Sequence, residues 1–385
     1  MGRLLTPVAT GARFPQRRTL GEEVARLSRR ALAPKTGLVH RIEGRRGPLT
    51  LAAERHLDDE KKGAAANFRW WTSPRHVPGA TVTPRRGARL FDQLAGVYTI
   101  FLTPFTSRGE VDFEAAAENT EYLIGERMNG IVVAGTYGEY VTLTGDERRA
   151  LLRSVINAAA GKVPVIACTA AGSTAEVIAF TRDAEDAGAD GAMITPPYGM
   201  IEPTETAIIE HFEAVARATG TGLLLYNNPN ISPSLAPDLL AHLADIDGYV
   251  GIKQGATTFL EHAELVALAG DRLRIFSGSD QMMVGSLALG AVGVSSTQSN
   301  FIPEIIRDTY EAMCRGDLVE ARRQFQRWAL FRRFARRVGQ PAAAKAAVEL
   351  LGRRCGGVRA PLVPLTTDQR AELATVLAGM GLEVK

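Results

Sequence analysis

Eight short apolar runs, separated by longer segments with helical spacing, dominate the chain between residues 96 and 296. The runs are GVYTIFLTP at 96–104, GIVVAG at 130–135, VPVIACTA at 163–170, GAMITPP at 191–197, TGLLLYNNP at 221–229, GYVGIKQ at 248–254, LRIFSGSD at 273–280 and GAVGVSS at 290–296. Each is apolar almost throughout, which is typical of strands buried on both faces of a sheet. Eight alternations of this kind predict an α/β fold of the TIM (β/α)8 barrel class.

An open, doubly wound parallel sheet is the alternative way to arrange alternating strands and helices. Its first strand would be followed by a Gly-x-Gly-x-x-Gly turn, and FLTPFTSRGE at 101–110 is not such a turn. Several helical patterns follow the last run, and together they are too long for the one helix that closes a barrel. The sequence therefore predicts a barrel at 91–300 and a C-terminal helical appendix at 301–385.

Residues 1–90 differ from the rest of the chain in composition. They hold 19 basic and 7 acidic side chains, whereas the remaining residues hold 26 and 35. Stretches such as RIEGRR and TPRRGAR lack apolar periodicity, so we predict a basic, disordered extension or a translation start assigned too early. A basic arm that binds nucleic acid and a transit peptide are alternatives, although GEEVAR and LDDEKK argue against the second.

Composition excludes several other classes. No run of eighteen apolar residues occurs, so no membrane-spanning helix is expected, and the basic excess of the extension does not indicate that the barrel binds nucleic acid. The three cysteines are widely spaced and odd in number, which fits neither a disulfide framework nor a zinc site and favours a cytoplasmic protein.

Lys253 is the most informative candidate for catalysis, because barrel chemistry takes place at the carboxyl ends of the strands. After residue 90 the other lysines are Lys162, Lys345 and Lys385, and Lys253 alone ends a predicted strand. Burial disfavours an ammonium, and a neutral amine attacks ketones to give imines. The alternative is a salt bridge from Lys253 to Glu139 or Asp280.

Tyr226 ends the neighbouring predicted strand, GLLLY. Adjacent strands lie about 4.8 Å apart, so its phenol can approach the amine of Lys253 and carry a proton to and from a carbinolamine. The alternative for Tyr226 is a core tyrosine whose hydroxyl is hydrogen-bonded.

The loop GTYGE at 135–139 follows the second run. Gly135 and Gly138 let the backbone bend and expose N–H groups, and Thr136 adds a hydroxyl, so the loop suits a small carboxylate. Glu139 is interpreted as facing a turn or capping the next helix. Gly278 and Asp280, at the end of the seventh run, are further candidates for substrate binding.

These motifs resemble the dihydrodipicolinate synthase and N-acetylneuraminate lyase family of class I, Schiff-base pyruvate lyases and aldolases. The resemblance covers about Leu94 to the C-terminus and rests on TPF at 103–105, GTYGE at 135–139, TPPY at 195–198, YNNP at 226–229, GIK at 251–253 and GSD at 278–280. It implies that Lys253 forms an imine with pyruvate or another 2-oxo acid, that Tyr226 relays protons and that Thr136 bonds to Tyr226.

The resemblance also implies an assembly and further roles. Tyr198 would complete the relay by reaching into the neighbouring subunit of a tight dimer, and the Thr136–Tyr137 backbone would hold the carboxylate of the 2-oxo acid. The protein would be a homotetramer, arranged as a dimer of dimers. No cofactor and no metal is implied.

Two positions depart from the family pattern. Tyr137 replaces a second threonine, which removes a hydroxyl and adds bulk. Ile231 stands where dihydrodipicolinate synthases carry an arginine that holds the carboxylate of the second substrate, and NNPNISPSL contains no cation. Ile231 therefore predicts a partner with an uncharged end, such as a neutral aldehyde or a sugar acid.

Other function classes remain to be weighed. A metal-dependent aldolase needs histidines or carboxylates at the strand ends, and the six histidines lie in the extension or in helical segments. A paralogue that binds a 2-oxo acid as a sensor would keep the site without turnover. The sequence favours a lyase that performs aldol chemistry with pyruvate; the alternatives are a dehydratase of 2-oxo-3-deoxy sugar acids and 4-hydroxy-tetrahydrodipicolinate synthase itself.

Overall fold

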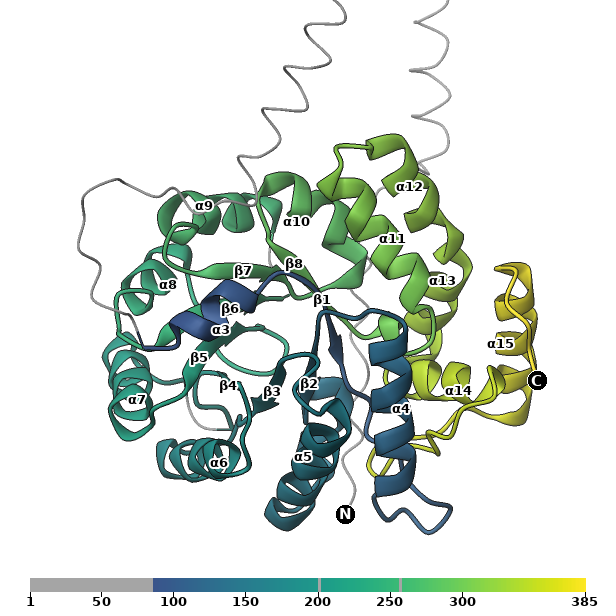
Figure 1. The fold of residues 1–385 in the computed structure, drawn as a ribbon, viewed down its shortest axis with the longest axis horizontal. Coiled ribbons are helices and arrows are strands. Elements are labelled where there is room, and N and C mark those ends of the chain that lie inside the picture. Colours follow the sequence, from purple (N-terminus) through teal and green to yellow (C-terminus); the bar gives the residue numbers. More distant parts are fainter. Residues whose placement is uncertain (1–85, 200–201, 256–257) are drawn as a thin grey trace, which may run out of the picture. The chain divides into compact units, whose positions relative to one another are not determined.

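The computed structural model describes residues 86–199, 202–255 and 258–385, and Figure 1 shows how their elements are arranged. Eight parallel strands form a closed barrel, in which each strand pairs with the next along the chain and β8 pairs with β1. The strands are β1 (Gly96–Ile100), β2 (Gly130–Val133), β3 (Val165–Cys168), β4 (Gly191–Ile194), β5 (Gly222–Asn227), β6 (Tyr249–Gln254), β7 (Arg274–Ser277) and β8 (Gly293–Ser296). The predicted TIM (β/α)8 barrel is confirmed.

One helix follows each strand and covers the outside of the barrel (Figure 1). These helices are α4 (Phe113–Gly125), α5 (Gly145–Ala159), α6 (Thr174–Asp186), α7 (Glu205–Ala218), α8 (Pro237–Leu243), α9 (Phe259–Ala269), α10 (Met283–Leu289) and α11 (Pro303–Cys314). Side chains that cap the first turn fix where several of them begin. Thr144 and Glu147 form a reciprocal capping box at the start of α5, for example, and Ser173 accepts a hydrogen bond from the Glu176 N–H at the start of α6.

A short helix before the barrel, α3 (Ala88–Gln93), packs at the amino ends of the strands. Its Leu90 is buried against the first residues of β4 and β5, Gly191 and Gly222, where any side chain would collide with it. Arg86 fastens the start of α3 by donating hydrogen bonds to the carbonyls of Ala216, Thr219 and Asp247. The helix therefore begins a few residues before the position at which the sequence divided extension from barrel.

The helical appendix consists of α12 (Leu318–Arg327), α13 (Ala329–Val338), α14 (Ala342–Leu350) and α15 (Thr367–Gly379). They lie on one side of the barrel, beside α11 and α4 (Figure 1). The predicted C-terminal helical region is therefore present. Within the described residues, no helix combines the length and apolar character needed to cross a membrane.

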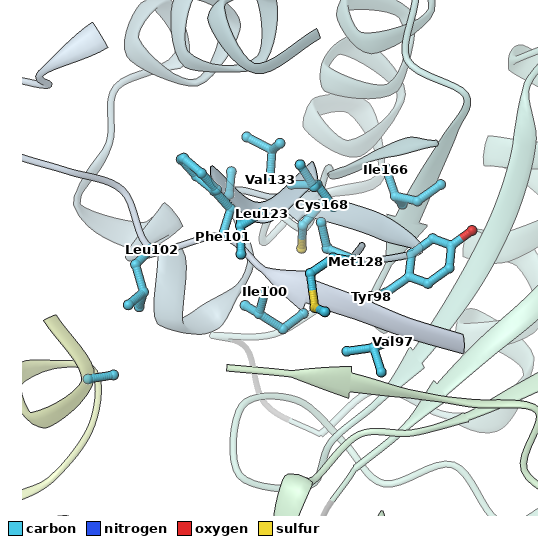
Figure 2. Close-up of a cluster of buried hydrophobic side chains, with 14 of the residues drawn as sticks. Val97, Tyr98, Ile100, Phe101, Leu102, Leu123, Met128, Val133, Ile166 and Cys168 are labelled. Atoms are coloured by element: carbon cyan, nitrogen blue, oxygen red, sulfur yellow. The ribbon is translucent and has the colours of Figure 1, made fainter. Parts of the chain in front are cut away.

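The core between the strands and the covering helices consists of two hydrophobic clusters. Figure 2 shows one part of it, where side chains from β1, β2, β3 and α4 meet. The labelled residues are Val97, Tyr98, Ile100, Phe101, Leu102, Leu123, Met128, Val133, Ile166 and Cys168. Full burial of each large apolar side chain contributes about 1.5–3 kcal/mol, so this part of the core makes a rigid base for the strand ends.

The prediction of a disordered extension concerns residues 1–90, of which 1–85 lie outside the described residues. We expect a chain that starts at Arg85 to fold with an unchanged thermal unfolding midpoint, because it keeps Arg86 and α3. A chain that starts at Leu94 removes the buried Leu90 and should lose at least the roughly 2–5 kcal/mol of a large-to-small core substitution. Thermal and denaturant unfolding of both truncated chains would test this. Insoluble protein from the first truncation would show that residues 1–84 are needed for folding.

Candidate active site

A cavity of about 480 Å3 opens at the carboxyl ends of the strands. This is the end at which barrels of this class carry out chemistry, and the volume lies in the usual range for small-molecule sites. Residues that follow β2, β5, β6, β7 and β8 line the cavity, and α13 contributes one wall. The lining residues that the site uses are Thr136, Tyr137, Tyr226, Asn228, Ile231, Lys253, Gly278, Asp280, Gln281, Gln298, Arg332, Arg336 and Gln340.

Lys253 and Tyr226 lie side by side on adjacent strands. They are direct register partners in the β5–β6 ladder, and the Lys253 Nζ lies 4.2 Å from the centre of the Tyr226 ring. Both are buried, with exposed fractions of 5% and 2%. No ion pair of Lys253 occurs among the described residues, because Glu139 pairs with Lys345 instead. Lys253 therefore presents its amine to the cavity.

The Tyr226 hydroxyl has two polar partners. It lies 3.2 Å from the Thr136 Oγ1, and it accepts a hydrogen bond of 3.0 Å from the Asn228 Nδ2. Thr136 belongs to a short 3-10 helix, η2 (Thr136–Gly138), which directly follows β2. The structure thus brings Lys253, Tyr226 and Thr136 together from three strand ends, and it adds Asn228, which the sequence argument passed over.

Two glycines shape the walls around these residues. Gly138 packs against the Phe101 carbonyl and Gly278 against the backbone of Gln254, and in both places a Cβ atom would overlap the neighbouring backbone. Gly278 lines the cavity, whereas Gly135 is buried beside it and is not among the lining residues. Gly135 and Gly138 were predicted to shape the carboxylate loop. Of the two, Gly138 is the one that lies too close to a neighbouring backbone segment to carry a side chain.

The Glu139 side chain does not cap the helix that follows TGDE, which corrects that part of the sequence interpretation. Its Oε1 accepts a hydrogen bond of 2.9 Å from the Lys345 Nζ on α14, and its Oε2 accepts one of 2.9 Å from the Arg359 N–H. Glu139 and Lys345 are each about 1% exposed. Thr144 and Glu147 provide the cap that the sequence assigned to Glu139. The pair ties the loop that carries Thr136 to the C-terminal helices.

Asp280 places a buried carboxyl group in the cavity wall. It is 6% exposed, its Oδ2 accepts a hydrogen bond of 3.0 Å from the Thr297 N–H, and its Oδ1 has no partner among the described residues. Burial raises the pKa of Asp280 to about 6, although hydrogen bonds and the charge of Lys253 act in the opposite direction. The Oε1 of nearby Gln298 also lacks a partner in the described chain. Both residues line the cavity.

Two arginines in the cavity wall were missed by the sequence argument. Arg332 and Arg336 lie one turn apart on α13 and line the same cavity as Lys253 and Ile231. The loop that carries Ile231 has no cation, as the sequence shows, but the cavity as a whole does. The helical period of FRRFARRV predicts which residues share a face, yet nothing in it indicates which face meets the barrel.

Tyr198 is not among the residues that line the cavity of its own chain. Its ring contacts the edge of the Tyr140 ring, with 6.2 Å between the ring centres, and burial raises the pKa of both hydroxyls. A role for Tyr198 in a neighbouring subunit stays a prediction.

Comparison with known proteins places this chain in a family. The model of the dihydrodipicolinate synthetase family matches residues 93–379. The 4-hydroxy-tetrahydrodipicolinate synthase of Nitratidesulfovibrio vulgaris is 33% identical over 292 residues, which cover 75% of this chain and 99% of the relative.

Solved structures give the same result. The dihydrodipicolinate synthase of Aquifex aeolicus matches with a TM-score of 0.73 and 30% identity, over 76% of this chain and 100% of that one. The chloride-inhibited dihydrodipicolinate synthase of Acinetobacter baumannii, solved in complex with pyruvate, matches with a TM-score of 0.72 and 30% identity, over 75% of this chain and 100% of that one.

We expect Glu139→Gln and Lys345→Met each to lower the free energy of unfolding by about 3–5 kcal/mol, because each leaves one member of a buried pair without its counter-charge. The double variant should be more stable than either single variant, since it buries no charge and the amide carbonyl introduced at position 139 can still accept from the Arg359 N–H. Glu213→Gln is the matched control. It breaks an exposed pair with Arg217 and should cost less than about 1 kcal/mol. Urea unfolding measures all four; additive losses in the double variant would contradict the coupling.

Proposed function

Because the chain belongs to the dihydrodipicolinate synthetase family, we propose that it is a Schiff-base lyase that binds pyruvate or another 2-oxo acid on Lys253. The observation that carries the proposal is the buried amine of Lys253, without an ion pair in the described chain, beside the hydrogen-bonded phenol of Tyr226. Aldol cleavage or condensation with pyruvate is the reaction that we favour.

The first chemical step forms the imine. The Lys253 amine attacks the C2 carbonyl carbon of the 2-oxo acid and gives a carbinolamine; the Tyr226 hydroxyl supplies the proton that lets the C2 oxygen leave as water. Thr136 and Asn228 orient this hydroxyl, and Thr136 offers a partner for the exchanged proton. Loss of water leaves a protonated imine.

The protonated imine then accepts electrons from the substrate. In aldol cleavage the hydroxyl on C4 gives its proton to the Tyr226 phenolate that the loss of water left behind, the bond between C3 and C4 breaks, and its electron pair forms an enamine with the imine carbon. The aldehyde departs and C3 takes a proton from the Tyr226 hydroxyl. Water then hydrolyses the imine, returns a proton to Tyr226, and releases pyruvate and the free Lys253 amine. Condensation is the same sequence in reverse.

The 2-oxo acid carboxylate belongs, in this proposal, on the backbone of Thr136 and Tyr137. This loop follows β2 directly, both residues line the cavity, and the loop approaches Tyr226 through Thr136. A relay completed by Tyr198 of a neighbouring subunit, a homotetramer and a cytoplasmic location remain predictions.

Dehydration of a 2-oxo-3-deoxy sugar acid is the second candidate. It begins with the same imine, and the polar side chains of Asn228, Gln281 and Gln298 line the cavity that would hold the hydroxyl groups of such a substrate. Assays of pyruvate with an aldehyde panel, alongside 2-oxo-3-deoxy sugar acids alone, would separate the two. Aspartate semialdehyde belongs in the panel because relatives bear the synthase name.

We expect sodium borohydride with pyruvate to add a reduced pyruvyl group to the peptide that contains Lys253, because hydride reduces an imine to a stable secondary amine. Peptide mass spectrometry locates the adduct. Lys345 is an internal control, since its amine is held by Glu139 and should stay unlabelled. Lys253→Ala should lose the label and essentially all turnover. A label on another lysine, or none, would refute the Schiff-base mechanism.

We expect Tyr226→Phe to lower kcat by about 10²–10⁴-fold, because it removes a general acid and base while keeping the ring. The KM for the 2-oxo acid should change little. Tyr249→Phe is the matched control: it removes the hydroxyl of another buried strand tyrosine, which donates to the Phe212 carbonyl away from the cavity. Steady-state kinetics compares the two. Similar rates for both variants would mean that Tyr226 only packs.

A further inference from the structure

Asn228 follows β5 directly and stands two residues after Tyr226. Successive side chains of a strand point to opposite faces, so Tyr226 and Asn228 share a side and Asn227 points to the other. The hydrogen bonds agree with this alternation. The buried Asn227 amide donates to the Leu235 carbonyl at 2.9 Å and accepts from the Leu235 N–H at 3.0 Å, which holds the loop. Asn228 instead lines the cavity beside Tyr226.

The backbone of the loop fixes the orientation of the Asn228 amide. Its Oδ1 accepts a hydrogen bond of 3.1 Å from the Asn230 N–H, and a backbone N–H can only donate. The amide oxygen must therefore face Asn230. The Nδ2 then faces the Tyr226 hydroxyl and donates a hydrogen bond of 3.0 Å to it. The direction of the bond between Asn228 and Tyr226 thus follows from the loop, and the amide cannot be turned round.

This direction gives the Tyr226 oxygen a donor that cannot take its proton. An amide NH2 group donates hydrogen bonds and has no lone pair to accept a proton. The Tyr226 proton is therefore exchanged with the Thr136 hydroxyl, whose Oγ1 lies 3.2 Å away, or with the substrate. Once the proton has left, the phenolate oxygen still accepts from Asn228. A hydrogen bond to a charged oxygen is stronger than one to a neutral oxygen, so the amide favours the charged form.

We propose that Asn228 is a positioning residue, which stabilises the Tyr226 phenolate that forms when water leaves the carbinolamine. The inference deepens the proposed function and rests on it, because this phenolate arises during imine formation at Lys253. Asn228 acts through Tyr226 and lowers the barrier of each step that passes through the phenolate. These steps are the loss of water and the transfer of protons to and from the substrate. The competing interpretation is that Asn228 only shapes the loop, by accepting from the Asn230 N–H.

Hydrogen exchange of pyruvate in D2O tests the proposal without knowledge of the second substrate. In the imine of pyruvate on Lys253, C3 gives a proton to the Tyr226 phenolate and an enamine forms. The proton on Tyr226 exchanges with solvent deuterium, and C3 takes up deuterium when the enamine reverts to the imine. Hydrolysis then releases deuterated pyruvate. Proton NMR measures how fast the methyl signal decays with the full-length protein and saturating pyruvate, and Lys253→Ala gives the background rate.

Asn228→Asp removes the donor and keeps the shape of the loop. The introduced carboxylate can still accept from the Asn230 N–H, but it presents to Tyr226 an oxygen that repels a phenolate. We expect exchange at neutral pH to be about ten- to a hundredfold slower than in the unsubstituted protein, as the loss of one charged hydrogen bond implies. The deficit should shrink as the pH falls toward about 4, the usual pKa of an aspartate, because a protonated carboxyl group again offers a donor.

Two further variants separate the donor from the loop. Asn228→Leu has a similar size and no polar atom, so its deficit relative to the unsubstituted protein should not change with pH. Asn129→Asp is the matched control: Asn129 also accepts from a backbone N–H, that of Val97 at 2.8 Å, but at the amino end of β1. It should exchange at the unsubstituted rate. The other ionisable groups that line the cavity are the same in every variant. They are Tyr137, Lys253, Asp280, Arg332 and Arg336.

The outcomes distinguish this inference from the imine on which it rests. Saturating pyruvate and borohydride should label Lys253 in each variant at position 228, which shows that the site is folded. Slow exchange in Asn228→Asp that recovers at low pH supports the proposal. Exchange at the unsubstituted rate in that variant, or a deficit that stays the same at every pH, overturns the role of Asn228 and leaves the Schiff-base mechanism standing. No exchange and no label in the unsubstituted protein overturn the mechanism and this inference together.

Discussion

The buried ion pair between Glu139 and Lys345 joins the barrel mouth to the helical appendix, and the geometry of the site depends on it. Removing either charge from water costs several kcal/mol unless the partner is in place. The appendix therefore cannot move away from the loop after β2 without exposing or stranding two charges. Because α13 directly precedes α14, this constraint also holds Arg332 and Arg336 over the cavity. Of the C-terminal helices, α13 thus forms part of the wall of the cavity that the strand ends also line.

The barrel contributes a second constraint, which is the register in which neighbouring strands pair. Backbone hydrogen bonds between β5 and β6 make Tyr226 and Lys253 direct neighbours, so their separation does not depend on flexible side chains. The loop after β2 then brings Thr136 to the Tyr226 hydroxyl, and Asn228 reaches it from the end of β5. A rigid sheet thus fixes the Lys253 amine, while short loops fix the hydrogen-bond partners of the Tyr226 hydroxyl.

These two constraints explain how much of the molecule could be predicted from its sequence. Strands buried on both faces leave continuous apolar runs, and neighbours along the chain are neighbours in the barrel, so Lys253 and Tyr226 could be paired from the sequence alone. The Glu139–Lys345 pair joins residues far apart in the chain, and the sequence around either residue gives no indication of its partner. The arginines of α13 were missed because a helical pattern carries no information about the element that it faces. The helix α3 was not predicted, because a six-residue helix has too few turns to show a period.

Asp280 links the electrostatics of the barrel to the proposed chemistry. Burial holds its pKa near 6, while Lys253 favours its ionised form. A free amine can lose its positive charge by losing a proton. A protonated imine keeps its charge until it accepts the electron pair of the bond that breaks in the substrate. Formation of the imine therefore stabilises the Asp280 carboxylate, which becomes the nearby counter-charge in the cavity wall. With the 2-oxo acid carboxylate also present, the imine end of the cavity carries no surplus positive charge. Arg332 and Arg336 add positive charge at the α13 end of the cavity, so the imine depends on Asp280 and the 2-oxo acid carboxylate for its counter-charge.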